Sequence, residues 1–287
     1  MENIVESILL QSLNGMSFIA ILALIGIGLG IQLIMMEVVN IAHSEFLMLG
    51  AYITLLFIPI LDNFWIGAVL AVILVGLFSL IFERTIIRPL YRRPLDTLLA
   101  TWGAGIVIRE LVGFIFGRQY KSIGLPISGF VSFWGIEYSA YRLFIIIVVI
   151  IVLLAVIAFF FKTEYGLKAR AIMTNREMAS AVGVNTYRVN QLVFALGAGL
   201  AALAGALISP IYSVGPYMGL EWLVGAFFVV VIGGVQTIWG PFAGAVVIGG
   251  AQGVVEYFLQ PVVAQIIILA VAIIVIRSRP KGLFIRS

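Results

Sequence analysis

The stretch KARAIMTNREMASAVG (168–183) forms the centre of a polar segment, Lys162–Arg188, in an otherwise apolar chain. The apolar runs on its two sides, 143–161 and 190–213, are each long enough to cross a bilayer, for which about 20 residues suffice. A polar segment between two membrane-crossing runs lies outside the hydrocarbon. The stretch therefore predicts a protein that crosses the membrane repeatedly and has a substantial loop on the cytoplasmic side.

This polar segment also predicts its own secondary structure. Asn175 is placed to act as an N-cap, an acid follows in the first turn, and Gly183 is placed to end the turn. We therefore predict a short helix from Arg176 to Val182 and a second helix, capped by Thr186, that returns to the membrane. A short, capped helix of this kind suits the groove of a partner protein. A plain connecting loop is the alternative interpretation.

Composition assigns the whole chain to the membrane class. Of its 287 residues, 63% are hydrophobic and 10% are charged, and the mean hydropathy is +1.19, which excludes an ordinary soluble domain. The apolar runs lack the alternation of a β-barrel, so we predict an all-α bundle of eight to nine spans with discontinuous helices. The runs lie near 8–36, 46–60, 64–82, 98–116, 143–161, 190–213, 222–238, 241–258 and 262–276.

The basic residues predict the orientation. Thirteen of the 17 Lys and Arg fall in three clusters, at 84–93, at 162–188 and from Arg277 onward. The excess of Lys and Arg on cytoplasmic loops places all three clusters in the cytoplasm, with an even number of spans between each pair. Nine spans put the N-terminus outside. If the first two runs form one re-entrant element, the spans number eight and the N-terminus lies inside.

Two polar interruptions break apolar runs in the two halves of the chain: MMEVVNIAHSEF (35–46) and VVIGGVQTIWGPFAG (230–244). Paired interruptions of this kind are typical of discontinuous helices around a substrate path. The first contains Glu37, Glu45 and the single histidine, His43. An ionisable group at membrane depth costs about 3 kcal/mol and so faces a cavity or a partner. A solvated turn at the membrane surface is the alternative interpretation.

The sequence excludes several other classes. Because it lacks the Gly-Lys-Ser or Gly-Lys-Thr of a P-loop, any ATP-driven action needs another chain. One histidine and no cysteine argue against a metal centre, and nothing suggests an enzyme or a cofactor. The positive-inside bias already explains the basic clusters, so no nucleic-acid partner is expected. A self-sufficient channel or secondary carrier is the alternative from another class, and a non-transporting scaffold is a weaker one.

Four stretches together carry a resemblance to a known family. They are VVNIAHSEFLMLGAY (38–52), RRPLDTLLATWG (92–103), the polar segment with ALGAGLAALAGAL (195–207), and RPKGLF (279–284). The chain resembles the membrane permease subunits of the branched-chain amino acid and urea type of ABC importer over essentially its whole length. The stretch RPLDTLLATWG is most similar to the urea and short-chain amide members. Ser44 stands where the family commonly has Gly in AHGE.

The resemblance implies a function and a set of partners. Residues 1–287 would form one permease domain in a bacterial inner membrane, importing urea or a short amide, or alternatively branched-chain or other small amino acids. The partners would be a second homologous permease, two cytoplasmic ATPases and a periplasmic binding protein. Segment 162–188 would couple to an ATPase through Gly166, Arg170, Ala171, Asn175, Ala179 and Gly183. For the substrate path we predict Asn40, His43, Ser44, Glu45, Thr97, Thr101 and Trp102, the polar groups in or beside apolar runs.

Overall fold

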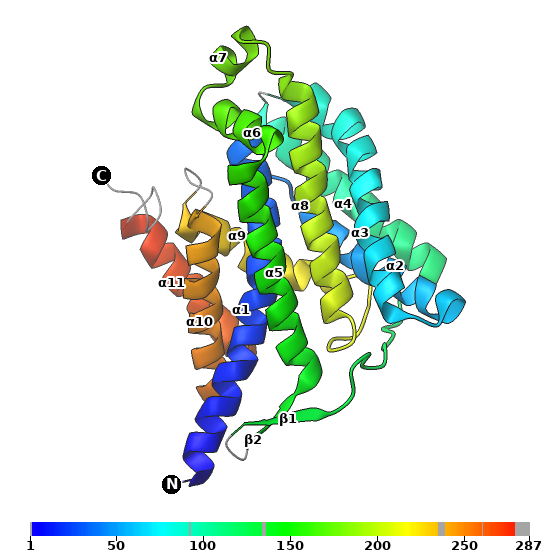
Figure 1. The fold of residues 1–287 in the computed structure, drawn as a ribbon, viewed down its shortest axis with the longest axis vertical. Helices are drawn as coiled ribbons and strands as arrows, with labels where there is room; N and C mark the ends of the chain where they lie inside the picture. Colours follow the sequence, from blue (N-terminus) through cyan, green and yellow to red (C-terminus); the bar gives the residue numbers. More distant parts are fainter. Residues whose placement is uncertain (1, 92, 134–135, 235–238, 260, 279–287) are drawn as a thin grey trace.

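The computed structural model describes residues 2–91, 93–133, 136–234, 239–259 and 261–278, and these fold into a helical bundle (Figure 1). The helices are α1 (Glu2–Met36), α2 (His43–Leu61), α3 (Phe64–Phe82), α4 (Pro94–Phe116), α5 (Ala140–Lys162), α6 (Glu164–Thr174), α7 (Arg176–Ala181), α8 (Thr186–Ile208), α9 (Met218–Gly233), α10 (Gly240–Phe258) and α11 (Pro261–Ser278). A π-helical turn η1 (Glu83–Ile87) and a 3-10 turn η2 (Arg88–Leu90) extend α3. The predicted RPKGLF stretch lies outside the described residues.

The long helices occupy the apolar runs that the sequence predicts. Within the described ranges, six helices are long and apolar enough to cross a membrane: 12–36, 43–61, 64–90, 94–116, 140–162 and 186–208. Helix α9, with 16 residues, is a shorter apolar helix, and α10 and α11 cover the last two predicted runs. The all-α class is therefore confirmed. The one departure is a short antiparallel ribbon between α4 and α5, made of β1 (Phe130–Phe133) and β2 (Ile136–Ser139).

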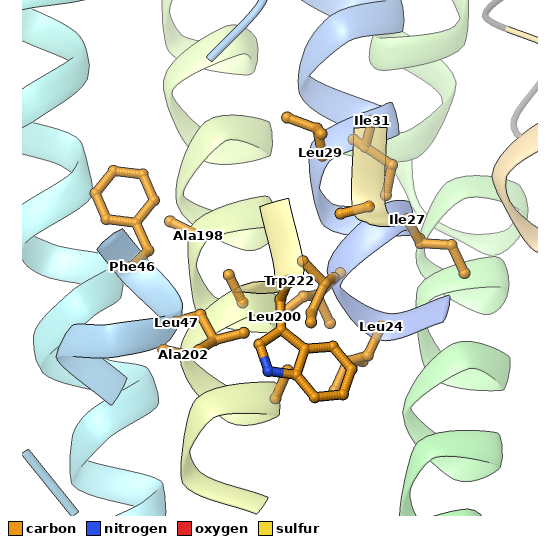
Figure 2. Close-up of a cluster of buried hydrophobic side chains, with 14 of the residues drawn as sticks. Leu24, Ile27, Leu29, Ile31, Phe46, Leu47, Ala198, Leu200, Ala202 and Trp222 are labelled. Atoms are coloured by element: carbon orange, nitrogen blue, oxygen red, sulfur yellow. The ribbon is translucent and has the colours of Figure 1, made fainter. Parts of the chain in front are cut away.

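The core forms around α1 and α8. Helix α1 packs against α5, α8, α9 and α10, and α8 also packs against α2 and α3. Figure 2 shows apolar side chains of α1, α2 and α8 converging with Trp222 of α9. Glycines allow these helices to approach closely: a side chain at Gly205 would collide with the Leu47 carbonyl of α2. Small residues on α8 therefore serve helix packing inside the chain.

Helix α4 is the least covered of the six helices that are long and apolar enough to cross a membrane. Only 22% of its most apolar window is buried, compared with 72% for α8. Large apolar side chains along it are exposed, among them Leu95, Leu99, Leu111 and Phe114. Its contacts are made mainly with α2 and with the two turns that precede it. One face of α4 is therefore open to lipid or to another protein.

The two ends of the bundle differ. Helices α6 and α7 project at one end, and the N-terminus and the β-ribbon lie at the other (Figure 1). The end of α11, which carries Arg277, lies on the same side as α6 and α7. The described parts of the three predicted cationic clusters thus gather at one end, as the cytoplasmic assignment requires. The position of the N-terminus agrees with the nine-span alternative.

Candidate functional site

The first polar interruption is a break between α1 and α2 inside the bundle. Helix α1 ends where Glu37 adopts a left-handed conformation, with φ of 55°, and its N–H donates to the Leu33 carbonyl at 2.9 Å. The chain then runs without helix until His43. Asn40, Ser44 and Glu45 are each 1% exposed and His43 is fully buried. The alternative of a solvated surface turn is therefore wrong for these four residues, whereas Glu37 is exposed.

The first turn of α2 is held on one side by His43 and Phe46. His43 Nε2 lies 3.2 Å from the Ile25 carbonyl oxygen of α1. The Phe46 ring meets the edges of Phe82 and Phe194, with centroids 5.4 and 5.9 Å away. Because His43 and Phe46 lie three residues apart, they share one face of the helix. Glu45 consequently points to another side of α2, toward α4.

Asn40, Thr97 and Thr101 bond mainly to the protein itself. Asn40 Nδ2 donates to Gln32 Oε1 at 3.1 Å. Thr101 Oγ1 accepts from the Ile41 N–H at 3.2 Å and joins α4 to the break. Thr97 Oγ1 donates to the carbonyls of Leu90 and Arg93. All three side chains are buried, and of the three only Thr101 joins the break to α4. A role for them in a substrate path stays a prediction.

Trp102, the remaining predicted path residue, does not join this group. It is 53% exposed, whereas Thr101, the residue before it, is fully buried. Successive residues of a helix point about 100° apart, so the two side chains lie on different faces of α4. Trp102 belongs to the open face of α4, and its part in a path likewise stays a prediction.

Glu45 forms a buried ion pair that sequence reasoning did not assign. Arg109 of α4 donates from Nη2 to Glu45 Oε1 at 2.5 Å, and the two side chains are 12% and 1% exposed. Gly105, one turn earlier on α4, lies against the Glu45 side chain: a Cβ there would be 3.7 Å from Glu45 Oε1, an ordinary contact distance. The presence of an arginine within an apolar run was the available signal. Its partner lies 64 positions away, beyond any local pattern.

Further polar groups continue from Arg109 toward the surface. The Arg109 guanidinium lies over the Tyr217 ring, 5.7 Å from its centroid. Tyr217 in turn donates to Glu110 Oε1 at 3.4 Å, and Arg118 donates to Glu110 Oε2 at 2.7 Å. Glu110 and Arg118 are 47% and 70% exposed. Together with Val107, Leu111, Gly113 and Phe114 they line a cavity of about 600 Å³.

The polar segment 162–188 contains the predicted capped helix and one that was missed. Asn175 Oδ1 accepts from the Met178 N–H at 2.9 Å, which confirms the N-cap of α7. Gly183 has φ of 88° and ends that helix. The cap of α8 is Asn185, whose Oδ1 accepts from the Arg188 N–H at 3.0 Å; the prediction of Thr186 is wrong by one residue. Helix α6, capped by Thr163, was not predicted.

The predicted coupling residues divide between the inside and the outside of this segment. Gly166 and Ala179 are buried, Arg170 is partly buried, and Ala171, Asn175 and Gly183 are exposed. Ala179 is only 3% exposed, so it is not part of the outward surface of α7, and its role in coupling stays a prediction. It faces inward because α7 packs on α6 and α8. Met178 and Val182, 62% and 73% exposed, form the outward surface.

A second buried carboxylate ties this segment to the end of α3. Glu83 is fully buried and accepts from Arg88 Nε at 3.2 Å, from Arg88 Nη2 at 2.8 Å and from the Tyr91 hydroxyl at 2.5 Å. The Tyr91 ring stacks on Tyr187 of α8 and lies under the Arg176 guanidinium of α7. Burial and the bond to Glu83 raise the pKa of Tyr91 above its ordinary value. A cleft of about 750 Å³ opens between this cluster and α7.

Comparison with known proteins decides the family. Residues 11–276 match the family described as "Branched-chain amino acid transport system / permease component". The chain belongs to this family. Its members are transport subunits and not enzymes, and the chain is a multi-pass protein of the inner membrane. No solved structure matches it with significance.

Relatives of this permease family span nearly the whole chain. The "High-affinity branched-chain amino acid transport system permease protein LivH" of Escherichia coli K12 is 29% identical over 95% of this chain and 94% of its own. The permease protein BraD of the corresponding system in Pseudomonas aeruginosa is 26% identical over the same shares. A protein of Methanocaldococcus jannaschii, described as a probable branched-chain amino acid transport permease protein LivH, is 22% identical over 92% of this chain and 88% of its own.

Proposed function

We propose that this chain is the membrane-spanning permease subunit of an ATP-driven importer for branched-chain or other small aliphatic amino acids. The observation that carries the proposal is the family match over 11–276, together with relatives named for branched-chain amino acid transport over the same length. The urea or short-amide substrate that RPLDTLLATWG favours receives no support from these names. The amino acid alternative takes its place.

The proposed partners follow from the absence of a P-loop in the sequence and from the exposed surface of α7. It has no P-loop, so hydrolysis of ATP requires a separate subunit. We infer that this subunit docks on α7, which projects beyond the long helices (Figure 1) and exposes Met178 and Val182. A second permease subunit against the open face of α4 and a periplasmic binding protein that delivers the solute complete the proposed importer.

The substrate assignment is tested with the assembled complex in proteoliposomes. ATP-dependent uptake of labelled leucine and of labelled urea is measured at saturating binding protein. We expect saturable leucine uptake and no urea uptake above liposomes without ATP. Uptake of urea with no uptake of leucine would reverse the assignment.

The docking role is tested at Met178 and not at the buried Ala179. Met178→Glu should uncouple ATP hydrolysis from leucine uptake without loss of fold, because a surface substitution changes stability by only about 0.5 kcal/mol. Leu125→Glu is the matched control, since Leu125 is 51% exposed in the loop after α4, away from the polar segment. Normal coupling in Met178→Glu would remove α7 from the docking surface.

A further inference from the structure

The Glu45–Arg109 pair retains unused hydrogen-bonding capacity in the interior. Glu45 Oε1 accepts from Arg109 at 2.5 Å and from the Ser44 hydroxyl only at 3.5 Å. Glu45 Oε2 and Arg109 Nε are both buried, and neither has a hydrogen-bond partner among the described protein groups. A buried carboxylate ordinarily uses both oxygens, because an unsatisfied polar atom costs about 1–3 kcal/mol. Each member of the pair can therefore still accommodate a ligand group.

A second pair of a glutamate and an arginine lies between the inner pair and the protein surface. Glu110 follows Arg109 directly, and Arg118 holds Glu110 at 2.7 Å. Tyr217 connects the pairs, with its ring under Arg109 and its hydroxyl on Glu110. Exposure rises from 1% at Glu45 and 12% at Arg109 to 47% at Glu110 and 70% at Arg118. The acids and bases thus alternate from the interior of the bundle to an open surface.

The outer pair is bordered by apolar side chains. Its cavity of about 600 Å³ is lined by Val107, Leu111 and Phe114 in addition to Glu110 and Arg118. A small molecule with one positive group, one negative group and an aliphatic side chain matches this lining. The inner pair carries the same two charges and is linked to this outer pair through Tyr217, which contacts both Arg109 and Glu110.

We propose that Glu110–Arg118 and Glu45–Arg109 are two successive binding stations for a zwitterionic α-amino acid. At each station the guanidinium binds the carboxylate of the solute and the glutamate binds its ammonium group. Tyr217 lies between the stations and guides transfer from the outer pair to the inner one. This inference rests on the proposed function, since it specifies how that function recognises an amino acid.

The chemistry explains why the ligand is a zwitterion. Separating Glu45 from Arg109 leaves two uncompensated charges in the interior, which is costly. A zwitterion supplies one opposite charge to each, so both remain paired while the solute is bound. Urea carries no charge and offers Glu45 and Arg109 only neutral hydrogen bonds, which are weaker. The inner pair consequently opens for an amino acid and stays closed to a neutral amide.

The decisive variant removes both charges of the inner pair together. E45Q/R109Q leaves no uncompensated charge in the interior, which is the main cost of breaking a buried pair, and its two amides can bond to each other, so it should fold. Loss of the two charge-assisted contacts to the solute should lower the rate of ATP-dependent leucine uptake about tenfold or more. Binding of leucine by the binding protein is unaffected. The control is R93Q/D96N, a pair at the opposite end of α4 whose side chains are 72% and 55% exposed.

The outcomes separate this inference from the proposed function. If wild-type complex imports leucine and E45Q/R109Q does so at the same rate while folded, the stations are wrong and the proposed function stands. If wild-type complex imports no amino acid, the proposed function fails. Should E45Q/R109Q not fold, E110Q/R118Q decides, because an exposed pair contributes only about 0–1 kcal/mol. A raised KM for leucine in that variant supports the outer station, and unchanged uptake overturns the proposal.

Discussion

In the part of the chain that the structure describes, two buried glutamates each pair with an arginine, and the two pairs are built in different ways. Glu83 is fully buried and uses both oxygens, with two bonds from Arg88 and one from Tyr91. Glu45 is 1% exposed, receives one strong bond from Arg109, and has an oxygen without a protein donor among the described residues. A carboxylate whose two oxygens both accept hydrogen bonds from the protein holds the surrounding structure in place. A carboxylate between two helices with one oxygen unbonded can still bind a ligand.

The two pairs also differ in how they depend on the fold. Glu83, Arg88 and Tyr91 lie within nine residues of one continuous turn, so movement of whole helices leaves them together. Glu45 and Arg109 join α2 to α4, the least covered long helix. A shift of α4 would therefore part the second pair and leave the first intact.

Arg109→Leu should have the largest effect on stability. It leaves Glu45 buried with no cation, and breaking a buried pair by removing one partner costs about 3–5 kcal/mol. The free energy of unfolding in lipid–detergent micelles measures the loss. E45Q/R109Q, in which no charge remains alone, should lose much less. Equal losses in the two variants would mean that the charge of Glu45 is compensated by another group.

Glu83→Gln should have an intermediate effect. The amide oxygen can still accept from Arg88, so the substitution removes the charge assistance and not the whole interaction, a loss of about 1.5–3 kcal/mol. The Arg88 side chain is 28% exposed and can be hydrated once its partner is lost, so the loss should be smaller than for Arg109→Leu. The same unfolding measurement compares them. A larger loss of stability for Glu83→Gln than for Arg109→Leu would contradict the distinction drawn between the two carboxylates.

Tyr91→Phe should cost about 1 kcal/mol near neutral pH, the usual contribution of one hydrogen bond. Because burial and Glu83 raise the Tyr91 pKa in the folded state, folding favours the protonated phenol. That contribution is complete below the unfolded pKa of about 10 and is lost as pH rises beyond it. Unfolding measured at pH 9 and above should therefore show a steeper loss of stability in the wild-type protein than in Tyr91→Phe. Parallel curves of stability against pH for the two proteins would contradict the raised pKa of Tyr91.

Arg176→Gln should have the smallest effect. Its guanidinium lies 5.3 Å from the centroid of the Tyr91 ring, and a cation–π contact of this kind contributes about 0.5–1 kcal/mol at an exposed site. The loss should be local to α7. Hydrogen exchange should accelerate in residues 176–181 and not in α2 or α4. Faster exchange around Glu45 would show that the two carboxylate clusters are coupled.

Short-range patterns in the sequence were sufficient for the apolar runs, the break before α2, and the ends of α7. An N-cap such as Asn175 and a left-handed Gly183 act within four residues, so spacing alone reveals them. The misplaced cap of α8 shows the limit of such patterns, because Asn185 and Thr186 are adjacent and both can cap a helix. The same limit of short-range patterns explains why α6 was not predicted.

Only the tertiary structure determined which groups meet. Arg109 and Glu45 are 64 positions apart, and the crossing of α2 and α4 brings them together. The packing of α7 on α6 and α8 turned Ala179 inward, and the position of α4 turned Thr101 inward and Trp102 outward. The physical reason is that a sequence records periodicity along one helix, whereas a contact between helices depends on the angle and depth at which they cross.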